Sequence, residues 1–138
     1  MLENIIIRPA VSKDIDSVIE LQSEDVMNAT GETWSKSHYG DIIKYGWLLV
    51  AEHNDKVIGY ICGEPLVHSG SMLWYHIVDK KFRGHGVGTM LLDYFEQVLK
   101  ESGIEWFVAY TSKKKVTEMH QKRGAVVGEV YTEIVKDF

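Results

Sequence analysis

The amino-acid sequence predicts an α/β protein in which a mixed β-sheet of six to seven strands is flanked by about four helices. Two observations lead to this expectation. Apolar runs of strand length recur along the chain, and segments whose apolar residues follow helical spacing lie between them. With 138 residues, of which 45% are hydrophobic and 25% charged, the chain is expected to bury its own core and to form one domain over residues 1–138.

The first half of the chain is expected to contain three strands and two helices. Ser12 is a suitable helix cap, and the residues after it that share one helical face are Ile15, Val18, Ile19, Gln22 and Val26. Residues 28–40 are polar and rich in turn formers, and a short second helix is expected at 41–46. The expected strands are residues 4–8, 47–53 and 56–67, with a hairpin turn at 54–56.

The second half continues the alternation of strands and helices. The expected elements are strands at 72–79 and 105–111, a long helix from Val87, a short helix at 114–123 and one or two closing strands within 125–138. Gly103 follows the long helix at the position where helices commonly end in glycine. The resulting order of elements predicts a mixed sheet.

Composition and charge exclude several classes of protein. The net charge of -5 argues against a nucleic-acid partner, and no run approaches the ~20 apolar residues of a membrane span. The N-terminal residues lack the basic region and cleavage site of a signal peptide, so a cytoplasmic protein is expected. Cys62 is expected to be buried, and the six histidines form no H-x-x-H or H-x₃-H pair, so no metal site is expected.

Three glycines alternate with other residues in the stretch RGHGVGTMLL, residues 83–92, where the long helix is expected to begin. Glycine lowers helix stability, so these positions need another reason. A helix N-terminus exposes unpaired N–H groups and a partial positive charge, which phosphate oxygens can approach over glycine. The spacing fits neither G-x-x-x-x-G-K-[ST] nor G-x-G-x-x-G. A phosphate cradle and a glycine turn for close helix–strand packing both remain open.

The stretch RGHGVG at 83–88 resembles the [Q/R]-x-x-G-x-[G/A] signature of the GNAT superfamily of acetyl-CoA-dependent N-acetyltransferases. The preceding IVDKKF is similar to the lead-in from the family's fourth strand, and MHQKRGA at 119–125 is similar to its L-Y-E-K-x-G-F segment. The resemblance begins at IIIRPA and extends over most of the chain. It implies a GNAT-like sheet that is splayed between its fourth and fifth strands.

The resemblance also implies how acetyl-CoA binds. The family's loop amides hold the pyrophosphate, and the matching residues here are Arg83, Gly84, His85, Gly86, Val87, Gly88 and Thr89. The pantetheine arm pairs with the open edge of the fourth strand, here around Ile77 and Val78. Lys113 stands where many members place an asparagine that contacts this arm. The lysines at 113–115 are interpreted either as contacts to a cofactor phosphate or as a solvated cluster.

Many members carry a tyrosine seven residues after that asparagine, and this tyrosine protonates the leaving thiolate. His120 occupies the position and can donate a proton, although a surface residue without that role is the alternative. Tyr110 is the substitute donor. His76, on the fourth strand, is either the base that accepts the ammonium proton or a buried structural histidine. Val108 replaces the carboxylate of ribosomal-protein alanine acetyltransferases, which argues against that substrate.

Substrate recognition is expected in the stretch 23–40, because loops over a rigid scaffold commonly carry selectivity. Its acidic and aromatic residues suit an amine on an apolar or polyamine-like body. The candidates are Glu24, Asp25, Trp34 and Tyr39, with Glu32, Glu64 and His68 as further groups of the same cleft. A packing role for the two aromatic residues is equally open.

The combined expectation is an enzyme that transfers an acetyl group from acetyl-CoA directly to a primary amine of a small molecule or peptide. The alternative is a catalytically weak acyl-CoA-binding sensor or regulatory module of the same fold, because His120 and Lys113 replace the usual tyrosine and asparagine. A third possibility is an interaction domain whose glycine loop only packs. The expected partners are acetyl-CoA and an amine acceptor, without nucleic acid or membrane, and an exposed last strand is compatible with a homodimer.

Overall fold

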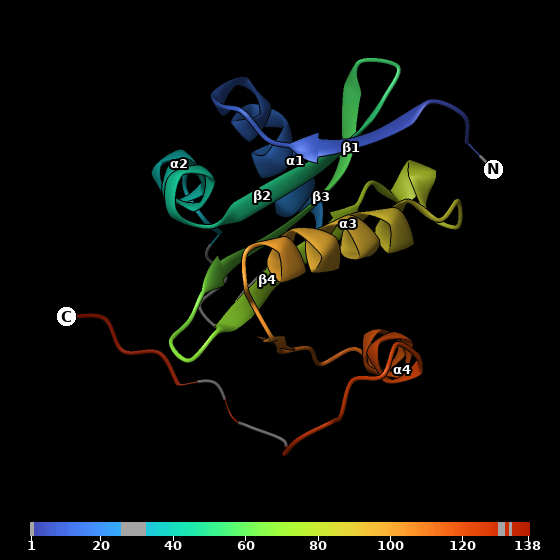
Figure 1. Cartoon of the computed structure of the whole chain (residues 1–138). Coiled ribbons are helices and arrows are strands. Elements are labelled where there is room, and N and C mark those ends of the chain that lie inside the picture. Colours follow the sequence, from blue (N-terminus) through green and yellow to red (C-terminus); the bar gives the residue numbers. More distant parts are fainter. Residues whose placement is uncertain (1, 26–32, 130–131, 133) are drawn as a thin grey trace.

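The computed structural model describes residues 2–25, 33–129, 132 and 134–138 (Figure 1). These residues contain one β-sheet of five strands in the order β1-β2-β3-β4-β5. The strands are β1 (Ile5–Pro9), β2 (Trp47–His53), β3 (Lys56–Pro65), β4 (Gly70–Val78) and β5 (Trp106–Ala109). β1 to β4 pair antiparallel with their neighbours, whereas β5 lies parallel to β4. The expected mixed α/β architecture is therefore confirmed.

Helices cover both faces of this sheet. In the described part of the chain they are α1 (Ile15–Asp25), α2 (Lys36–Tyr45), α3 (Val87–Glu101) and α4 (Lys114–Lys122). α1 and α2 pack on one face, α3 packs on the other, and α4 follows β5 (Figure 1). None of the helices that the structure describes has the length and apolar character needed to cross a bilayer.

The number of strands is smaller than the six to seven that the sequence predicts. The apolar residues of 125–138 predict one or two closing strands, but the described residues of this segment belong to no strand. A strand needs a neighbour that receives its N–H and C=O groups. In Figure 1 the chain beyond α4 runs away from the sheet. The β-branched residues of this segment favour a strand, but they do not supply the partner.

Two local expectations are confirmed. The hairpin between β2 and β3 turns at Asn54 and Asp55, whose φ angles of 48° and 63° are those of a turn that matches strand twist. Cys62 is fully buried, and burial raises the pKa of its thiol to about 12. At neutral pH this thiol is therefore protonated, which argues against a nucleophilic role.

The core consists of two apolar clusters, one on each face of the sheet. α1 and α2 contribute Val18 and Tyr39 to the first, which packs on Tyr60 of β3. α3 contributes its buried stripe to the second, namely Leu91, Leu92, Phe95 and Leu99. Gly103 ends α3 with a φ of 79°, as expected for the residue after a helix. The sheet thus lies between helices, and the C-terminal end of β4 leads into the loop that precedes α3.

A buried carboxylate joins the start of α1 to the sheet. Ser12 does not cap this helix, because a 3₁₀ turn at Ser12–Asp14 precedes α1, with Val11 as its N-cap residue. The Asp14 carboxylate instead accepts the Val11 N–H at 2.8 Å. It also accepts two hydrogen bonds from the Arg8 guanidinium on β1, at 2.8 and 3.0 Å. Arg8 in turn reaches Glu52 of β2 at 3.3 Å.

We predict that Asp14→Asn lowers the free energy of unfolding at pH 7 by about 2 kcal/mol, since charge-assisted hydrogen bonds are lost in a buried place. The Arg8 hydrogen bonds hold the pKa of Asp14 below its ordinary value of 3.8. The ionised carboxylate thus stabilises the fold above that value, and the contribution is lost as the pH falls through the lower folded-state pKa. Urea titrations from pH 7 to pH 2 measure both effects.

The matched control is Asp16→Asn, because the Asp16 side chain is 77% exposed and pairs with Lys36 at the surface. This variant should change the free energy of unfolding by less than about 0.5 kcal/mol. Equal losses for the two variants, or an unaltered acid dependence for Asp14→Asn, would contradict the assignment.

Candidate functional site

The loop between β4 and α3 takes a conformation that requires glycine at two positions. Gly84 and Gly86 have φ angles of 82° and 83°, in the left-handed region that costs other residues energy. A Cβ atom added to either glycine would meet no other atom within 4 Å. The loop therefore presents bare backbone to open space, where a ligand can approach closely.

Helix–strand packing does not explain these glycines. A Cβ atom added to Gly88, the third glycine, would lie 3.5 Å from His76 Nε2 and 3.7 Å from Val78 Cγ2, which are ordinary contact distances. Gly88 is thus the glycine nearest the sheet, and even there a side-chain carbon fits. The spacing of the glycines left two explanations open, a phosphate-binding loop and a turn for close helix–strand packing. The geometry favours the phosphate-binding loop.

The N-terminus of α3 lies directly behind this loop. Its N-cap residue is Gly86, which has no side chain to bind the helix amides, and the Met90 N–H donates to the Gly86 carbonyl at 3.0 Å. α2 is built differently, because the hydroxyl of its N-cap residue Ser35 accepts the His38 N–H at 3.2 Å. The first-turn amides of α3, together with the helix dipole, are suited to an anion such as a phosphate.

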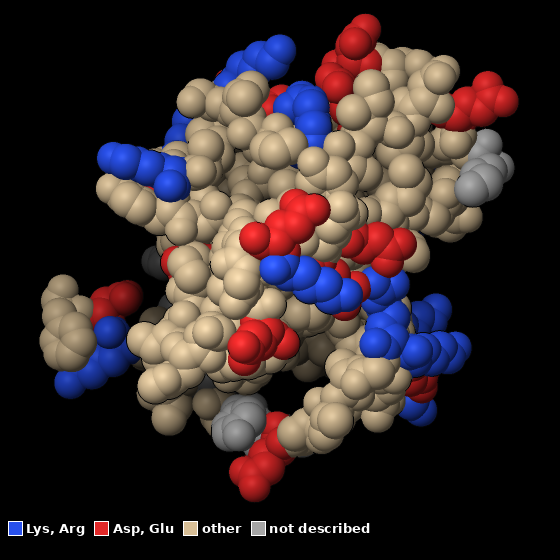
Figure 2. All heavy atoms as spheres, viewed as in Figure 1, with Lys and Arg blue, Asp and Glu red and all other residues tan. Residues whose placement is uncertain are grey.

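Positive side chains accompany the loop although the whole chain has a net charge of -5. Lys80 and Lys81 are exposed in the 3₁₀ turn that leads into it, and Arg83 is exposed at its start. In Figure 2 a second group of Lys and Arg side chains gathers at the right edge, over α4. Both groups raise the local potential on the side of the molecule where α3 begins.

β4 is paired on both sides for only part of its length. Its pairs with β5 run from Gly70↔Trp106 to Leu73↔Ala109, while its pairs with β3 continue to Val78. Within the described chain, the second half of β4 therefore has no strand on the β5 side. This divergence is the splay between the fourth and fifth strands that the family resemblance implies.

Not every residue of this half of β4 presents its backbone to the open edge. The Asp79 N–H donates to the Ile58 carbonyl at 2.8 Å, so these residues form a hydrogen-bonded pair. Such pairs alternate along an antiparallel ladder, so Ile77 is bonded to Tyr60 in the same way. The main chain of Ile77 is thus turned toward β3, and its side chain is buried in the core.

His76 and Val78 stand at the alternate positions and direct their main-chain groups to the open edge. Arg83 Nε donates to the Val78 carbonyl at 3.0 Å, which ties the start of the glycine loop to the end of β4. Of the two residues that we expect to pair with a pantetheine arm, Val78 offers main-chain groups on this edge, whereas those of Ile77 face the neighbouring strand.

His76 is held in one orientation by α3. Its Nε2 lies 2.7 Å from the Gly88 carbonyl, which can only accept, so Nε2 carries a proton and Nδ1 has the lone pair of the neutral ring. Burial lowers the pKa of His76 below 6.5, the hydrogen bond to Gly88 opposes the shift, and the charge of His120 adds to it. At neutral pH His76 is therefore a neutral imidazole that can accept a proton.

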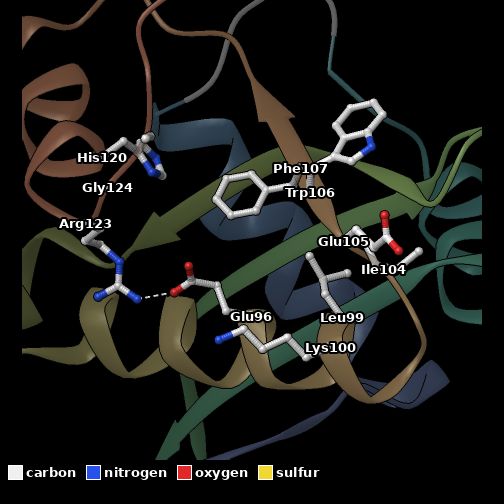
Figure 3. Close-up of a pocket in the computed structure, with 11 residues that line it drawn as sticks. Glu96, Leu99, Lys100, Ile104, Glu105, Trp106, Phe107, His120, Arg123 and Gly124 are labelled. Carbon is white, nitrogen blue, oxygen red and sulfur yellow. Dashed lines mark hydrogen bonds and ion pairs between the residues drawn. The ribbon is translucent and has the colours of Figure 1, made fainter.

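His120 lies beside a cavity of about 290 Å³ between α3, β5 and α4 (Figure 3). Its ring packs edge to face against Phe107 of β5, with ring centroids 6.0 Å apart. Burial lowers the pKa of His120, the charge of Arg123 lowers it further, and Glu96 partly offsets both effects. His120 is therefore mainly neutral at neutral pH, where it is a better proton acceptor than donor.

Arg123 fastens the end of α4 to α3. Its guanidinium pairs with Asp93 at 2.7 Å and with Glu96, both on α3, and the dashed line in Figure 3 marks the second contact. The pairing holds α4 against the cavity, so the position of His120 depends on these two carboxylates. Because the arginine comes from the segment after α4, its role was not visible in the sequence.

Several of the remaining expected site residues are exposed or lie outside the described residues. Lys113 is the exposed N-cap residue of α4, and Tyr110 is 67% exposed just beyond β5. Glu24 is exposed at the end of α1, while the side chain of Asp25 and all of Glu32 lie outside the described residues. The residues that the structure describes contain no group of three or more His, Cys, Asp or Glu side chains that could hold a metal ion.

The two aromatic residues expected to contact the acceptor have different surroundings. Tyr39 is fully buried, and its hydroxyl donates to Gln22 Oε1 at 2.6 Å, so the structure places this ring in the core. Trp34 is half-buried and packs against Trp74 of β4, which the sequence did not single out. The sequence signal that could have indicated these surroundings was Gln22. It is a polar residue on an otherwise apolar helix face, and it needs hydrogen-bond partners when buried.

Comparisons with known proteins agree with this geometry. A model of the acetyltransferase (GNAT) family matches residues 15–125, while a search of curated proteins gives no match. A solved structure of the PaiA N-acetyltransferase from Thermoplasma acidophilum, in complex with coenzyme A, is 19% identical and has a TM-score of 0.76, covering 93% of this chain and 93% of that chain.

Two further structures are similar over nearly the whole chain. An aminoglycoside acetyltransferase from an uncultured soil metagenomic sample is 14% identical with a TM-score of 0.79, covering 100% of this chain and 99% of that one. A transcriptional regulator from Bacillus halodurans C-125 is 17% identical with a TM-score of 0.79, covering 96% of this chain and 100% of that one. The family model spans the glycine loop, the divergent β4 and α3, and the chain belongs to the acetyltransferase (GNAT) family.

Proposed function

We propose that this protein transfers the acetyl group of acetyl-CoA directly to a primary amine of a small molecule or peptide. The observation that carries the proposal is the open glycine loop at the start of α3, which adjoins the unpaired half of β4. Membership of the acetyltransferase family and a structural relative in complex with coenzyme A support it.

The loop residues suit the pyrophosphate of acetyl-CoA. The N–H groups from Arg83 to Thr89 supply donors, and Lys113 supplies positive charge for the outer phosphates. The space that a Cβ atom would occupy at Gly84 and Gly86 is open, as a bound phosphate requires. When bound, acetyl-CoA supplies an activated acyl group whose thioester carbon an amine can attack.

The open edge of β4 suits the pantetheine arm. His76 and Val78 direct main-chain groups there, and the amides of an extended arm can pair with a strand edge as an added strand does. Such pairing fixes the reacting carbonyl near the point where β4 and β5 part. Holding the two reactants in line accounts for much of the acceleration in a direct transfer, because their translational and rotational entropy is already lost on binding.

The proton transfers fall to groups near this point. The ammonium form of the acceptor loses a proton to His76 Nδ1, and its nitrogen then attacks the thioester carbon. The C–N bond forms and the C–S bond breaks, the nitrogen sheds its second proton to water, and the thiolate takes up a proton from His120. The lowered pKa of His120 makes its protonated form a strong donor but a scarce one at neutral pH. Tyr110 is the alternative donor.

The second candidate function is an acyl-CoA sensor with weak or no transfer activity. His120 and Lys113 at the positions of the usual tyrosine and asparagine favour it, and so does the mainly neutral state of His120 at neutral pH. A structural relative described as a transcriptional regulator is compatible with a regulatory role for this fold.

Calorimetry with coenzyme A, followed by thiol release from acetyl-CoA over a panel of amines, peptides and aminoglycosides, distinguishes these functions. The enzyme binds coenzyme A and releases thiol faster with at least one acceptor. A sensor binds coenzyme A without any acceptor response. Absence of coenzyme A binding leaves an interaction domain and overturns both proposals.

We predict that Gly86→Asp weakens coenzyme A binding by at least about tenfold, because a side chain and a negative charge enter the phosphate site. Gly103→Asp is the matched control, since Gly103 also has a positive φ of 79° and open space around its Cβ position but lies at the other end of α3. Calorimetry should find that Gly103→Asp leaves the affinity for coenzyme A unchanged. The two variants should lower the melting temperature by similar amounts. Equal affinities would remove the phosphate assignment.

We predict that His120→Phe lowers kcat by at least about tenfold and changes the dissociation constant of coenzyme A by less than about threefold, because the ring contact with Phe107 survives and the proton donor does not. Steady-state kinetics and calorimetry provide the two numbers. An unchanged kcat would show that His120 is not the proton donor, and Tyr110→Phe would then test Tyr110 in that role.

We predict that Arg123→Met raises the pKa of His120, because a neighbouring positive charge that disfavours the imidazolium is removed. If His120 is the acid, the loss of kcat with rising pH should move to higher pH by a similar interval. NMR titration of the His120 ring and a pH–rate profile measure the shift, with Lys122→Met as the control. A constant or lowered pKa would contradict the electrostatic account.

A further inference from the structure

On the α1 and α2 side of β4, Trp34 contacts the rings of His38, Tyr39, Trp74 and Tyr75. We call Trp34, Trp74 and Tyr75 the aromatic cluster. The ring of Trp34 lies 5.7 Å from that of Trp74 and 4.7 Å from that of Tyr75, measured between centroids, and both contacts are edge to face. The function proposed above uses none of these three side chains. They adjoin the point where β4 loses its pairing with β5.

An irregularity in β4 brings two consecutive residues to the same ring. Cys62 is paired with Tyr75 and Gly63 with Leu73, so Trp74 is an extra residue without a partner on β3. Consecutive side chains of a regular strand point to opposite faces, and a bulge re-aims one of them. The bulge accounts for Trp74 and Tyr75 both contacting Trp34.

Trp34 is held in place by buried hydrogen bonds. Gln22 Nε2 donates to the Trp34 carbonyl at 3.0 Å, and the Trp34 N–H donates to Gln22 Oε1 at 3.1 Å. Gln22 is fully buried and also accepts the Tyr39 hydroxyl, which lies 2.8 Å from the hydroxyl of Tyr60. The cluster is therefore built on a rigid support before any ligand arrives.

A carboxylate completes the group. The Trp74 indole N–H donates to Glu64 Oε1 at 2.9 Å, and the Trp74 residue remains 38% exposed. Within the described chain no lysine or arginine forms an ion pair with Glu64. Aromatic faces carry negative potential, so an exposed indole beside a carboxylate that lacks a cationic partner is suited to an organic cation.

The cluster lies beside the proposed transfer point. Trp74 directly follows Leu73, whose pair with Ala109 is the last between β4 and β5. One strand residue spans about 3.3 Å, so the backbone of Trp74 lies within a few ångströms of the place where the strands part. An ammonium that stays charged against Glu64 cannot be the attacking amine, because the attacking nitrogen must first give its proton to His76. It must belong to another part of the acceptor.

We propose that the aromatic cluster and Glu64 bind a second, non-reacting ammonium group of the acceptor, so that the protein selects diamines and larger polycations over monoamines. This inference rests on the acetyl transfer proposed above and names the substrate class of that site. The exposed ring of Trp74 and the charge of Glu64 stabilise the second ammonium, whereas the stacked His38 ring already covers one face of Trp34.

Binding of tetramethylammonium tests the site without any reaction, because this cation cannot be acetylated and needs no acetyl-CoA. Its methyl resonance should move upfield on titration with the protein, since the methyl groups lie over an aromatic face. Two variants should lower its affinity by about fivefold, which corresponds to about 1 kcal/mol. Glu64→Gln removes the charge but keeps an acceptor for the Trp74 N–H, and Trp74→Leu removes the aromatic face.

Tyr45→Leu is the matched control. Tyr45 is also an exposed ring, 66% accessible, and it lies at the end of α2 under the Lys44 ammonium. Removing it should leave tetramethylammonium binding unchanged. If tetramethylammonium shows no shift, or if its affinity is the same in Glu64→Gln, Trp74→Leu and Tyr45→Leu, the cation site is overturned.

Kinetics with matched acceptors test the substrate class. A diaminobutane with an amine at each end should have a lower KM than butylamine, which has the same carbon chain and a single amine. Glu64→Gln should raise the KM for the diamine by about fivefold relative to that for butylamine. Equal KM values for the two amines in the unaltered protein overturn the selection of diamines. Failure of coenzyme A to bind overturns the acetyl transfer instead, and the tetramethylammonium titration then decides the cation site alone.

Discussion

β4 pairs with β5 only over its first four residues, whereas its pairing with β3 continues to its end, and this unequal pairing determines where ligands can bind. Main-chain groups on an unpaired edge inside a protein need partners. The edge formed by His76 and Val78 is therefore a place where an extended ligand gains hydrogen bonds. The glycine loop leaves the end of the same strand, and the bulge at Trp74 lies where the pairing stops.

The two sides of β4 differ in electrostatic character. On the α3 side, helix amides and lysines near the glycine loop favour an anion. On the α1 and α2 side, Glu64 and the rings around Trp34 favour a cation. His76 and His120 are kept neutral by burial and oppose neither. An anionic ligand and a cationic ligand can thus approach one strand from opposite sides.

Much of the fold was predictable because it depends on neighbours in the chain. Helical spacing predicted α1 and α3, and the turn residues predicted the hairpin at Asn54 and Asp55. The closing strands expected in 125–138 were wrong for the described residues, because a strand exists through a partner that its own residues do not specify. The same limit applies to Tyr39, whose buried place depends on Gln22 and Tyr60 rather than on the residues beside it.

For the candidate site, the amino-acid order alone was sufficient for the glycine loop, since a positive φ at Gly84 and Gly86 is a local demand that glycine meets at little cost. The three-dimensional arrangement decided which side chains meet across long separations. Trp34 and Trp74 are far apart in the chain, and they touch because a bulge turns one ring toward a helix-bound partner. Such contacts depend on register and packing, which short-range patterns do not encode.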